Sequence, residues 1–371
     1  MAKSAVVLIL GARPQIVKSA PLIYLASRDS SIEFNVIHTG QHYDYEMTKV
    51  FFDEFQLPDP VENLNVGSGS HAVQTAKMMQ RLEKILLELK PGVVVVPGDT
   101  NSTLAGAITA VKLHMRVAHI EAGARSYDMK MPEEINRRLT DHCSSVLFTS
   151  TNNCTENLLK EGIEKKSIHT VGDTMYDVLL QQLPKIEGNT ILKKLNLKAK
   201  TYGLLTIHRP ENVDNSKRLK SVVDAVTQLK SIRIVFPVHP RTENQLKRAG
   251  LYDRLVREKH VNLIKPVSYI ENLNLMKNAR VVLTDSGGMQ KEAFWLETPC
   301  ITLRDNTEWV ETVELGANHL TGSNTKLIVK AAGKILDGRK RLGKGSVKMP
   351  NPFGNGRASE KILKIIRTLF D

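Results

Sequence analysis

The fold is decided by one stretch of the chain, which reads Val281-Val282-Leu283-Thr284-Asp285-Ser286-Gly287-Gly288-Met289-Gln290-Lys291-Glu292. A short apolar run ends in a Ser-Gly-Gly turn, and apolar residues at helical spacing follow the turn. This pattern predicts a strand that enters a helix through a glycine turn, where backbone N–H groups can face an anion. The same glycines could serve packing alone, and these residues by themselves favour neither interpretation.

Strand-like and helix-like segments alternate on both sides of this stretch, which is typical of doubly wound parallel sheets. The pattern restarts after a boundary near residues 172–183 and so predicts two Rossmann-like α/β domains that face a ligand cleft. The expected strands are Ala5–Leu10, Phe34–His38, Gly92–Pro97, Val117–Ile120, Ser145–Thr149, Ile168–Val171, Tyr202–Thr206, Ile232–Pro237, Val261–Ile264, Val281–Thr284 and Pro299–Thr302. The expected helices include Ile16–Arg28 (after a turn at Gly11–Gln15), Glu46–Phe55, His71–Leu89, Ser102–Leu113, Glu133–His142, Ser216–Leu229, Ile270–Met276 and Ser359–Phe370.

Length and composition exclude several classes of protein. The 371 residues favour two domains, and a hydrophobic content of 41% is that of an ordinary globular chain. No apolar run approaches the roughly 18 residues of a membrane span, and Met1–Leu10 lacks a signal-peptide pattern. Cys143, Cys154 and Cys300 offer neither a disulfide framework nor zinc spacing. We therefore expect a cytoplasmic protein with no membrane partner.

The net charge of +13 raises the question of nucleic-acid binding. Much of the excess lies in dispersed lysines and in the basic segment 339–348, and the chain shows no ribonucleoprotein motif, zinc finger or basic zipper. We therefore expect anionic small-molecule ligands and no nucleic-acid partner.

Polar side chains collect where the expected strands end, the edge at which parallel sheets bind ligands. Each has a structural explanation as well: Glu133 suits a helix start, and Asp99 could cap the helix that follows it. Cations and carboxylates together suit a nucleotide sugar, with Arg13, Lys18, Arg209 and backbone amides meeting the diphosphate. The sequence has no P-loop, no Gly-x-Gly-x-x-Gly and no metal-ligand spacing, so we expect no metal and no cofactor. The residues at this edge are Arg13, Lys18, Asp99, Glu121, Glu133, Arg137, His208, Arg209, His239, Ser286, Gly287, Gly288, Glu292 and Arg304.

A series of motifs, in order over nearly the whole chain, resembles the non-hydrolysing UDP-N-acetylglucosamine 2-epimerases. The motifs are Gly11-Ala12-Arg13-Pro14-Gln15 with Lys18, Gly98-Asp99-Thr100, His119-Ile120-Glu121-Ala122-Gly123, Pro132-Glu133-Glu134-Ile135-Asn136-Arg137, Gly172-Asp173-Thr174, His208-Arg209, Pro237-Val238-His239, Thr284–Glu292, Arg304-Asp305 with Thr307-Glu308, and Asn351-Pro352-Phe353-Gly354 with Gly356-Arg357-Ala358-Ser359.

The resemblance implies a GT-B type fold whose final helix returns to the first domain, and a homodimer. It implies domains at residues 1–172 with 357–371, which carry the catalytic carboxylates, and at 173–356, which bind UDP. Matched motif by motif, Asp99, Glu121 and Glu133 are the catalytic carboxylates, and His208 assists at the leaving phosphate. The substrate-binding positions are Arg13, Lys18, Arg137, Arg209, His239, Ser286, Gly287, Gly288, Glu292 and Arg304.

The family reaction inverts C2 of the sugar and interconverts UDP-GlcNAc and UDP-ManNAc for surface polysaccharide synthesis. The resemblance implies anti-elimination: UDP leaves C1, a carboxylate removes the C2 proton, and a 2-acetamidoglucal remains bound. UDP then adds back as C2 is protonated from the opposite face. Carboxylates suit both proton transfers and an oxocarbenium-like transition state. Which carboxylate serves which face stays open.

Three departures from the family pattern favour a neighbouring branch. Gln15 replaces a usual glutamate, residues 41–47 keep only the opening Gln-His, and Trp309-Val310 stands where many members have Arg-Pro. Together they resemble the branch that acts on UDP-2,3-diacetamido-2,3-dideoxyglucuronate. Residues 41–47 also lie where bacterial members bind a regulatory UDP-sugar, so that regulation stays open. Two competing functions use the same fold and ligand, namely a GT-B glycosyltransferase and a non-enzymatic UDP-sugar sensor.

Overall fold

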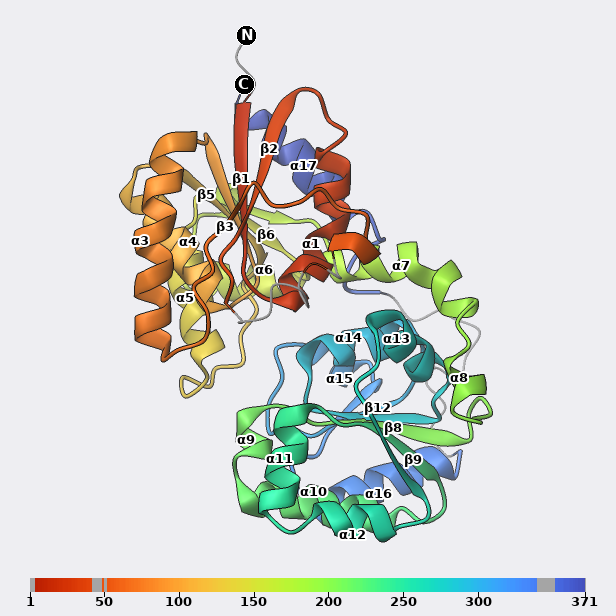
Figure 1. Cartoon of the computed structure of the whole chain (residues 1–371). Helices are drawn as coiled ribbons and strands as arrows, with labels where there is room; N and C mark the ends of the chain where they lie inside the picture. Colours follow the sequence, from red (N-terminus) through yellow and green to blue (C-terminus); the bar gives the residue numbers. More distant parts are fainter. Residues whose placement is uncertain (1–3, 42–48, 50–51, 339–350, 371) are drawn as a thin grey trace. The chain divides into compact units, whose positions relative to one another are not determined.

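The structure, a computed structural model, describes residues 4–41, 49, 52–338 and 351–370 of the chain (Figure 1). The chain divides into two compact units, Met1–Leu180 with Asn351–Asp371, and Gln181–Pro350. Within the described ranges, no helix combines the length and the apolar character needed to cross a membrane.

The first unit is built on a seven-stranded parallel sheet with the strand order β3-β2-β1-β4-β5-β6-β7. Chain order reverses between β1 and β4, and such a switch point is where open parallel sheets bind ligands. The central strand β4 is apolar and buried throughout, as a strand covered by helices on both faces must be. The strands are β1 (Ser4–Leu10), β2 (Ile32–His38), β3 (Glu62–Asn63), β4 (Val93–Pro97), β5 (Arg116–Ala122), β6 (Val146–Thr149) and β7 (Ile168–Thr170).

Helices cover this sheet, each with one apolar stripe turned inward. On α3 that stripe is Met78, Leu82 and Leu86, which are fully buried. The helix α5 is an exception, because most of its buried side chains are polar or charged. The helices of the unit are α1 (Arg13–Ala26), α3 (His71–Leu89), α4 (Asn101–Lys112), α5 (Pro132–Cys143), α6 (Asn152–Lys160), α7 (Thr174–Glu187, which continues into the second unit) and α17 (Ala358–Thr368), with a 3₁₀ turn at Lys165–Ser167.

The end of the chain returns to the first unit, as predicted. The helix α17 packs on α1 (Figure 1). Its start is held by Asp177 of α7. The Asp177 carboxylate accepts hydrogen bonds from the backbone N–H groups of Ala358 (3.0 Å) and Ser359 (2.7 Å). A carboxylate satisfies the first N–H groups of a helix, which have no partner inside the helix, so the contact fixes where α17 begins.

The second unit contains a six-stranded parallel sheet with the order β10-β9-β8-β11-β12-β13. Its switch point lies between β8 and β11. The strands are β8 (Tyr202–Thr206), β9 (Arg233–Pro237), β10 (Val261–Ile264), β11 (Val281–Thr284), β12 (Cys300–Thr302) and β13 (Asn318–Leu320). The helices are α8 (Ile191–Lys194), α9 (Pro210–Val213), α10 (Ser216–Gln228), α11 (Pro240–Arg248), α12 (Tyr252–Arg257), α13 (Tyr269–Asn278), α14 (Gly287–Trp295), α15 (Val310–Glu314) and α16 (Thr325–Leu336).

The two parallel sheets confirm the predicted fold class, and a few local predictions are wrong. The predicted turn at Gly11–Gln15 is partly helical, because α1 already begins at Arg13 and a proline is tolerated in a first helical turn. The short strands β3 and β13 were not predicted, since their polar residues give no apolar run. Of the predicted helix Glu46–Phe55, residues 49 and 52–54 are helical, residue 55 is not, and 46–48, 50 and 51 lie outside the described residues. The departure at 41–47 lies outside them except for residue 41. The assignment of carboxylates to one domain and UDP to the other stays a prediction.

Candidate functional site

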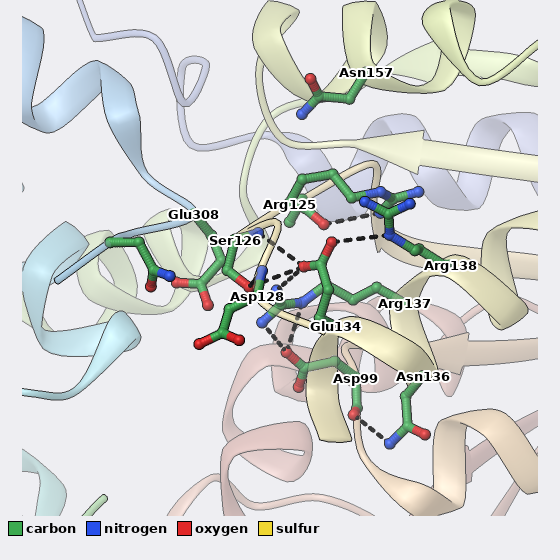
Figure 2. A network of polar contacts seen from close by, with 12 residues as sticks. Asp99, Arg125, Ser126, Asp128, Glu134, Asn136, Arg137, Arg138, Asn157 and Glu308 are labelled. Atoms are coloured by element: carbon green, nitrogen blue, oxygen red, sulfur yellow. Dashed lines mark hydrogen bonds and ion pairs between the residues drawn. The ribbon is translucent and has the colours of Figure 1, made fainter. Parts of the chain in front are cut away.

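Asp99 lies just beyond the end of β4, in the turn that starts α4. Its Oδ2 accepts hydrogen bonds from Arg137 Nε (3.0 Å) and Nη2 (2.9 Å), as Figure 2 shows. The carboxylate is about one-third exposed (32%), whereas the guanidinium is buried. A fixed guanidinium fork orients a carboxylate. Asp99 is therefore held in one orientation by Arg137, and solvent, and hence a ligand, can still reach it.

Arg137 is in turn held by Glu134, a fully buried carboxylate on the same helix (Figure 2). Arg137 Nη1 lies 3.1 Å from Glu134 Oε2, which also accepts from the backbone N–H of Ser126 (2.8 Å). Arg138 Nε donates to Glu134 Oε1 (3.1 Å). Burial raises the pKa of Glu134, but these hydrogen bonds and charges outweigh burial and hold it below its ordinary value. The sequence pattern gave Glu134 no role beyond a favourable helix start.

Glu121 occupies an irregular position at the end of β5. Its backbone is left-handed (φ +72°), and the register with β6 shifts between Ile120 and Ala122. A non-glycine residue with positive φ costs about 1–2 kcal/mol and persists only where the surroundings fix it. The strained backbone turns the carboxylate toward Lys18 of α1, with which it forms a mostly buried ion pair.

Gly98 explains how the ends of β4 and β5 approach each other. Its φ is +73°, and a Cβ atom built there would lie 3.0 Å from Lys18 Nζ and 3.7 Å from Glu121 Oε2. Any side chain would crowd the ion pair, so glycine is needed for both conformation and space. Asp99 and the Lys18–Glu121 pair are therefore neighbours on one sheet edge.

Glu133 differs from the other two predicted catalytic carboxylates. It is half-buried in the first turn of α5, four residues before Arg137. Within the part of the chain that the structure describes, its side chain forms no hydrogen bond or ion pair, whereas Asp99 and Glu121 each contact a cation. Arg13 is the first residue of α1, five residues before Lys18, and its side chain is exposed.

In the second unit, His208 follows β8 and is bound by Asp285, which follows β11. His208 Nδ1 lies 3.2 Å from Asp285 Oδ1, and the backbone N–H groups of His208 and Arg209 donate to the same carboxylate at 3.1 Å. Burial raises the pKa of Asp285, but the hydrogen bonds from His208, Asn212 and Arg209 outweigh burial and hold it below its ordinary value. Asp285 belongs to the stretch that decides the fold, but the sequence pattern did not mark it as a site residue.

The Ser-Gly-Gly turn forms the start of α14, as the sequence predicts. Ser286 caps the helix, with Oγ accepting from the backbone N–H of Met289 (3.4 Å). A Cβ atom on Gly287 would lie 3.4 Å from Trp309 Nε1, so the indole edge borders the turn. Among the described residues, the backbone N–H groups of Gly287 and Gly288 have no acceptor. They are available to an anion, as at other helix starts.

Charged side chains around this turn are buried and paired. Arg304 donates to both oxygens of Glu308, from Nη1 (2.8 Å) and from Nη2 (2.9 Å). Lys291, only 1% exposed, places Nζ 3.8 Å from the centre of the Trp309 ring. Glu292 is buried, and its Oε1 accepts from the hydroxyl of Tyr269 (3.0 Å). Glu308, Lys291 and Tyr269 were not predicted as site residues, because their role depends on packing that periodicity does not reveal.

Two further predicted binding residues begin short helices. His239 caps α11, with Nδ1 accepting from the backbone N–H of Arg241 (3.3 Å), and Arg209 is the residue before α9. Both lie at the carboxyl ends of strands in the second unit. Among the described residues, no group of three or more His, Cys, Asp and Glu side chains could hold a metal ion.

Comparison with known proteins places the chain in one family. A family model described as "UDP-N-acetylglucosamine 2-epimerase" matches residues 26–367. The UDP-N-acetylglucosamine 2-epimerase of Methanocaldococcus jannaschii is 50% identical over 365 residues, which cover 97% of this chain and 98% of that protein. The UDP-2,3-diacetamido-2,3-dideoxy-D-glucuronate 2-epimerase of Pseudomonas aeruginosa is 41% identical, covering 97% and 99%.

The solved structures agree. A crystal structure of the Methanocaldococcus jannaschii UDP-GlcNAc 2-epimerase in complex with UDP-GlcNAc and UDP matches with a TM-score of 0.90 and 48% identity, covering 98% of this chain and 99% of that one. A glycosyltransferase from Rickettsia africae, at 13% identity and a TM-score of 0.60, shares the fold alone. Identity at this level over nearly the full length of both chains means that the chain belongs to the UDP-N-acetylglucosamine 2-epimerase family.

Proposed function

We propose that the chain is a UDP-N-acetylglucosamine 2-epimerase, an isomerase that interconverts UDP-GlcNAc and UDP-ManNAc. The observation that carries the proposal is the group of acids at one edge of the first sheet. Asp99 follows β4 and Glu121 lies near the end of the neighbouring strand β5. Glu133 lies in the first turn of the helix whose Arg137 binds Asp99. Such a group suits a reaction that removes a proton from one face of a carbon and adds a proton to the opposite face.

The chemistry follows from the C2 hydrogen, which is not adjacent to a carbonyl and is not acidic. Breaking the C1–O bond sends its electron pair to UDP, and the resulting positive character at C1 makes the C2 proton removable. One carboxylate takes that proton and a double bond forms between C1 and C2. UDP adds back to C1 while another acid protonates C2 from the opposite face. Asp99, Glu121 and Glu133 are the groups we assign to these transfers.

The leaving diphosphate needs positive charge and N–H donors. We assign the backbone N–H groups of Gly287 and Gly288 and the hydroxyl of Ser286 to the UDP phosphates, and Glu292 to the ribose hydroxyls. His208 is assigned to the departing phosphate, since Asp285 binds Nδ1 and leaves Nε2 as the nitrogen for the ligand. Arg13, Lys18, Arg209, His239 and Arg304 complete the proposed substrate-binding set.

The choice of sugar rests on similarity across the family. The UDP-N-acetylglucosamine 2-epimerase of Methanocaldococcus jannaschii is 50% identical, against 41% for the diacetamidoglucuronate enzyme. The second sugar was suggested only by three sequence departures taken together, at Gln15, residues 41–47 and Trp309-Val310. Turnover of the two substrates should be measured side by side, and a ratio in favour of the uronate would reverse the assignment.

The epimerase proposal is tested by isotope exchange at C2. UDP-GlcNAc is incubated with the protein in deuterated water, and we expect deuterium at C2 of both epimers. Asp99→Asn, Glu121→Gln and Glu133→Gln should each slow the exchange by about 10²- to 10⁴-fold. Glu83→Gln, which changes an exposed acid on α3 of the same unit, should leave the rate unchanged. A wild-type protein that incorporates no deuterium with either sugar contradicts the proposal.

We also propose a cytoplasmic homodimer. Ile135 and Leu139, one turn apart on α5, are exposed, and so are Tyr127 and Met129 in the preceding loop. These residues form an exposed apolar surface, while the polar and charged side chains of α5 are buried on its other side. Exposed apolar surfaces are typical of subunit contacts. We expect a dimer by light scattering, a monomer for Leu139→Lys, and a dimer for Leu327→Lys, whose exposed leucine lies on α16. Dimeric Leu139→Lys protein would refute this contact surface.

A further inference from the structure

We propose that His119 and Asp141 are positioning residues that together hold the backbone beside two catalytic carboxylates. Neither side chain is exposed, so neither can touch the substrate. They act on the turn before Asp99 and on the irregular end of β5 that carries Glu121. This inference rests on the proposed epimerase function, because it assigns these residues to the placement of that reaction's acids.

His119 joins two segments through its two ring nitrogens. Nε2 lies 2.7 Å from the backbone carbonyl oxygen of Gly98, and Nδ1 lies 2.6 Å from Asp141 Oδ1. A carbonyl oxygen can only accept a hydrogen bond, so Nε2 donates. An ionised carboxylate can also only accept, so Nδ1 donates as well. The ring therefore contacts both segments through its two nitrogens.

Asp141 has the partners that keep it ionised. Its Oδ2 accepts from the backbone N–H of Gly123 (3.1 Å) and forms an ion pair with Arg125 Nη2 (2.7 Å). Burial raises the pKa of Asp141, but His119 and Arg125 outweigh burial and hold it below its ordinary value. Asp141 thus binds Gly123 on one oxygen and, through His119, Gly98 on the other.

The charges in this cluster balance, which makes their burial tolerable. Arg125 donates to both oxygens of Glu161, from Nε (2.8 Å) and Nη2 (2.7 Å). His142 Nε2 lies 3.6 Å from Glu161 at the exposed margin. Arg125 and His119 therefore face the carboxylates of Asp141 and Glu161, and each of these groups has a hydrogen-bonded partner. A buried pair missing one member would be strongly unfavourable, so the cluster is held as a set.

The backbone that His119 and Asp141 bind has an unfavourable conformation that other contacts must stabilise. Gly98 (φ +73°), Glu121 (φ +72°) and Gly123 (φ +77°) all lie in the left-handed region. Gly98 directly precedes Asp99, and Gly123 follows Glu121 by two residues. Strained conformations persist only when several contacts fix them, and misplacement by about 1 Å can cost about 10²-fold in rate. The His119–Asp141 pair contacts Gly98, which precedes Asp99, and Gly123, which follows Glu121 by two residues. It therefore stabilises the backbone beside both acids.

The protonation of His119 is tested on the wild-type protein by long-range ¹H–¹⁵N correlation of the histidine rings, with His119→Gln used for assignment. Because both partners of the ring are hydrogen-bond acceptors, we expect an N–H group on each ring nitrogen. A ring nitrogen of His119 that carries no proton overturns the inference. This measurement needs neither a folded variant nor any enzymatic activity.

The positioning role is tested by kinetics and hydrogen exchange on His119→Gln and Asp141→Asn. We expect kcat to fall about 10- to 100-fold with KM within twofold, and the Gly123 amide to exchange faster. His119→Gln, which keeps one donor, should retain more activity than His119→Ala. His169→Gln, a change of a partly buried histidine on β7, should leave kcat unchanged.

The outcomes separate this inference from the proposed function. If the wild-type protein is inactive, the epimerase assignment is wrong. The protonation of the His119 ring and the hydrogen exchange of the Gly123 amide still test whether His119 and Asp141 bind Gly98 and Gly123. If the wild-type protein is active and His119→Gln keeps the full kcat, the positioning role is overturned. It is also overturned if the variant unfolds and its kcat and KM both change in proportion to the unfolded fraction.

Discussion

Asp285 binds His208 at three points, with its carboxylate accepting the backbone N–H on both oxygens at 3.1 Å and contacting ring Nδ1 at 3.2 Å. The carboxylate is fully buried, whereas the imidazole is half exposed. The contact sets which nitrogen of His208 faces the protein and fixes the turn after β8 to the turn after β11. A buried acid therefore orients an exposed base across the switch point of the second sheet.

Asp285→Asn should destabilise the protein by about 1–3 kcal/mol at neutral pH, because an amide cannot accept N–H donors on both of its terminal atoms. Denaturant unfolding of the variant and the wild type measures the difference. Asp253→Asn, on the exposed side of α12, is the matched control and should change stability by less than about 0.5 kcal/mol. Equal midpoints for Asp285→Asn and the wild type would contradict the buried contact.

Acid should weaken the fold through Asp141, Asp285 and Glu134, whose pKa values are all lowered. A carboxyl with a lower pKa in the folded state stabilises the fold above its unfolded pKa of about 4, and that contribution disappears as the pH falls through the folded pKa. Stability measured in urea should therefore fall steadily below about pH 4. The deficit of Asp285→Asn should shrink over the same range, and a constant deficit would be inconsistent with an ionised Asp285.

Gln15→Glu should be destabilising, because the side-chain amide of Gln15 both donates and accepts hydrogen bonds. Gln15 is buried, its Oε1 accepts from Gly11 and Ala12, and its Nε2 donates to the carbonyl oxygen of Pro97 (2.8 Å). Glutamate would set an acceptor against that carbonyl, at about 1–3 kcal/mol. Thermal or urea unfolding measures the loss, and Gln80→Glu on the exposed face of α3 is the control. An unchanged midpoint would show that a protonated glutamate or a shifted backbone substitutes for the amide.

Gly123→Ala should be far more harmful than Gly162→Ala. Both glycines have positive φ (+77° and +84°), so both variants carry the same backbone penalty of about 1–2 kcal/mol. A Cβ atom on Gly123 would lie 2.2 Å from the carbonyl oxygen of Cys154, whereas Gly162 has open space. The comparison of unfolding free energies isolates the steric part, and similar losses for the two variants would refute it.

The sequence alone predicts the fold because its strands are unambiguous. The four valines Val93–Val96 can only be a buried strand, and the rule that ligands bind at strand ends then directs attention to Asp99 and Glu121. The short strand β13, with the residues Asn-His-Leu, lacks any such signal and is defined only by its pairing with β12.

Partners within the site could not be predicted in the same way. Arg137 was expected to bind substrate, and the structure places it between Asp99 and Glu134, a relationship that depends on the rotation of α5 about its axis. Asp285 and Asp141 were not predicted, because a buried acid and an exposed one look alike in a sequence. Their importance arises from backbone N–H groups, which the sequence does not display. The substrate role of Arg137 stays a prediction.

The return of α17 to the first unit has a consequence for biosynthesis. A ribosome makes the whole second unit before it makes the helix that covers α1 and binds Asp177. Until then the surface of α1 that α17 covers remains exposed, while the second unit already has every strand of its sheet. The nascent chain therefore passes through a stage in which its later half can mature first and its earlier half is a substrate for chaperones.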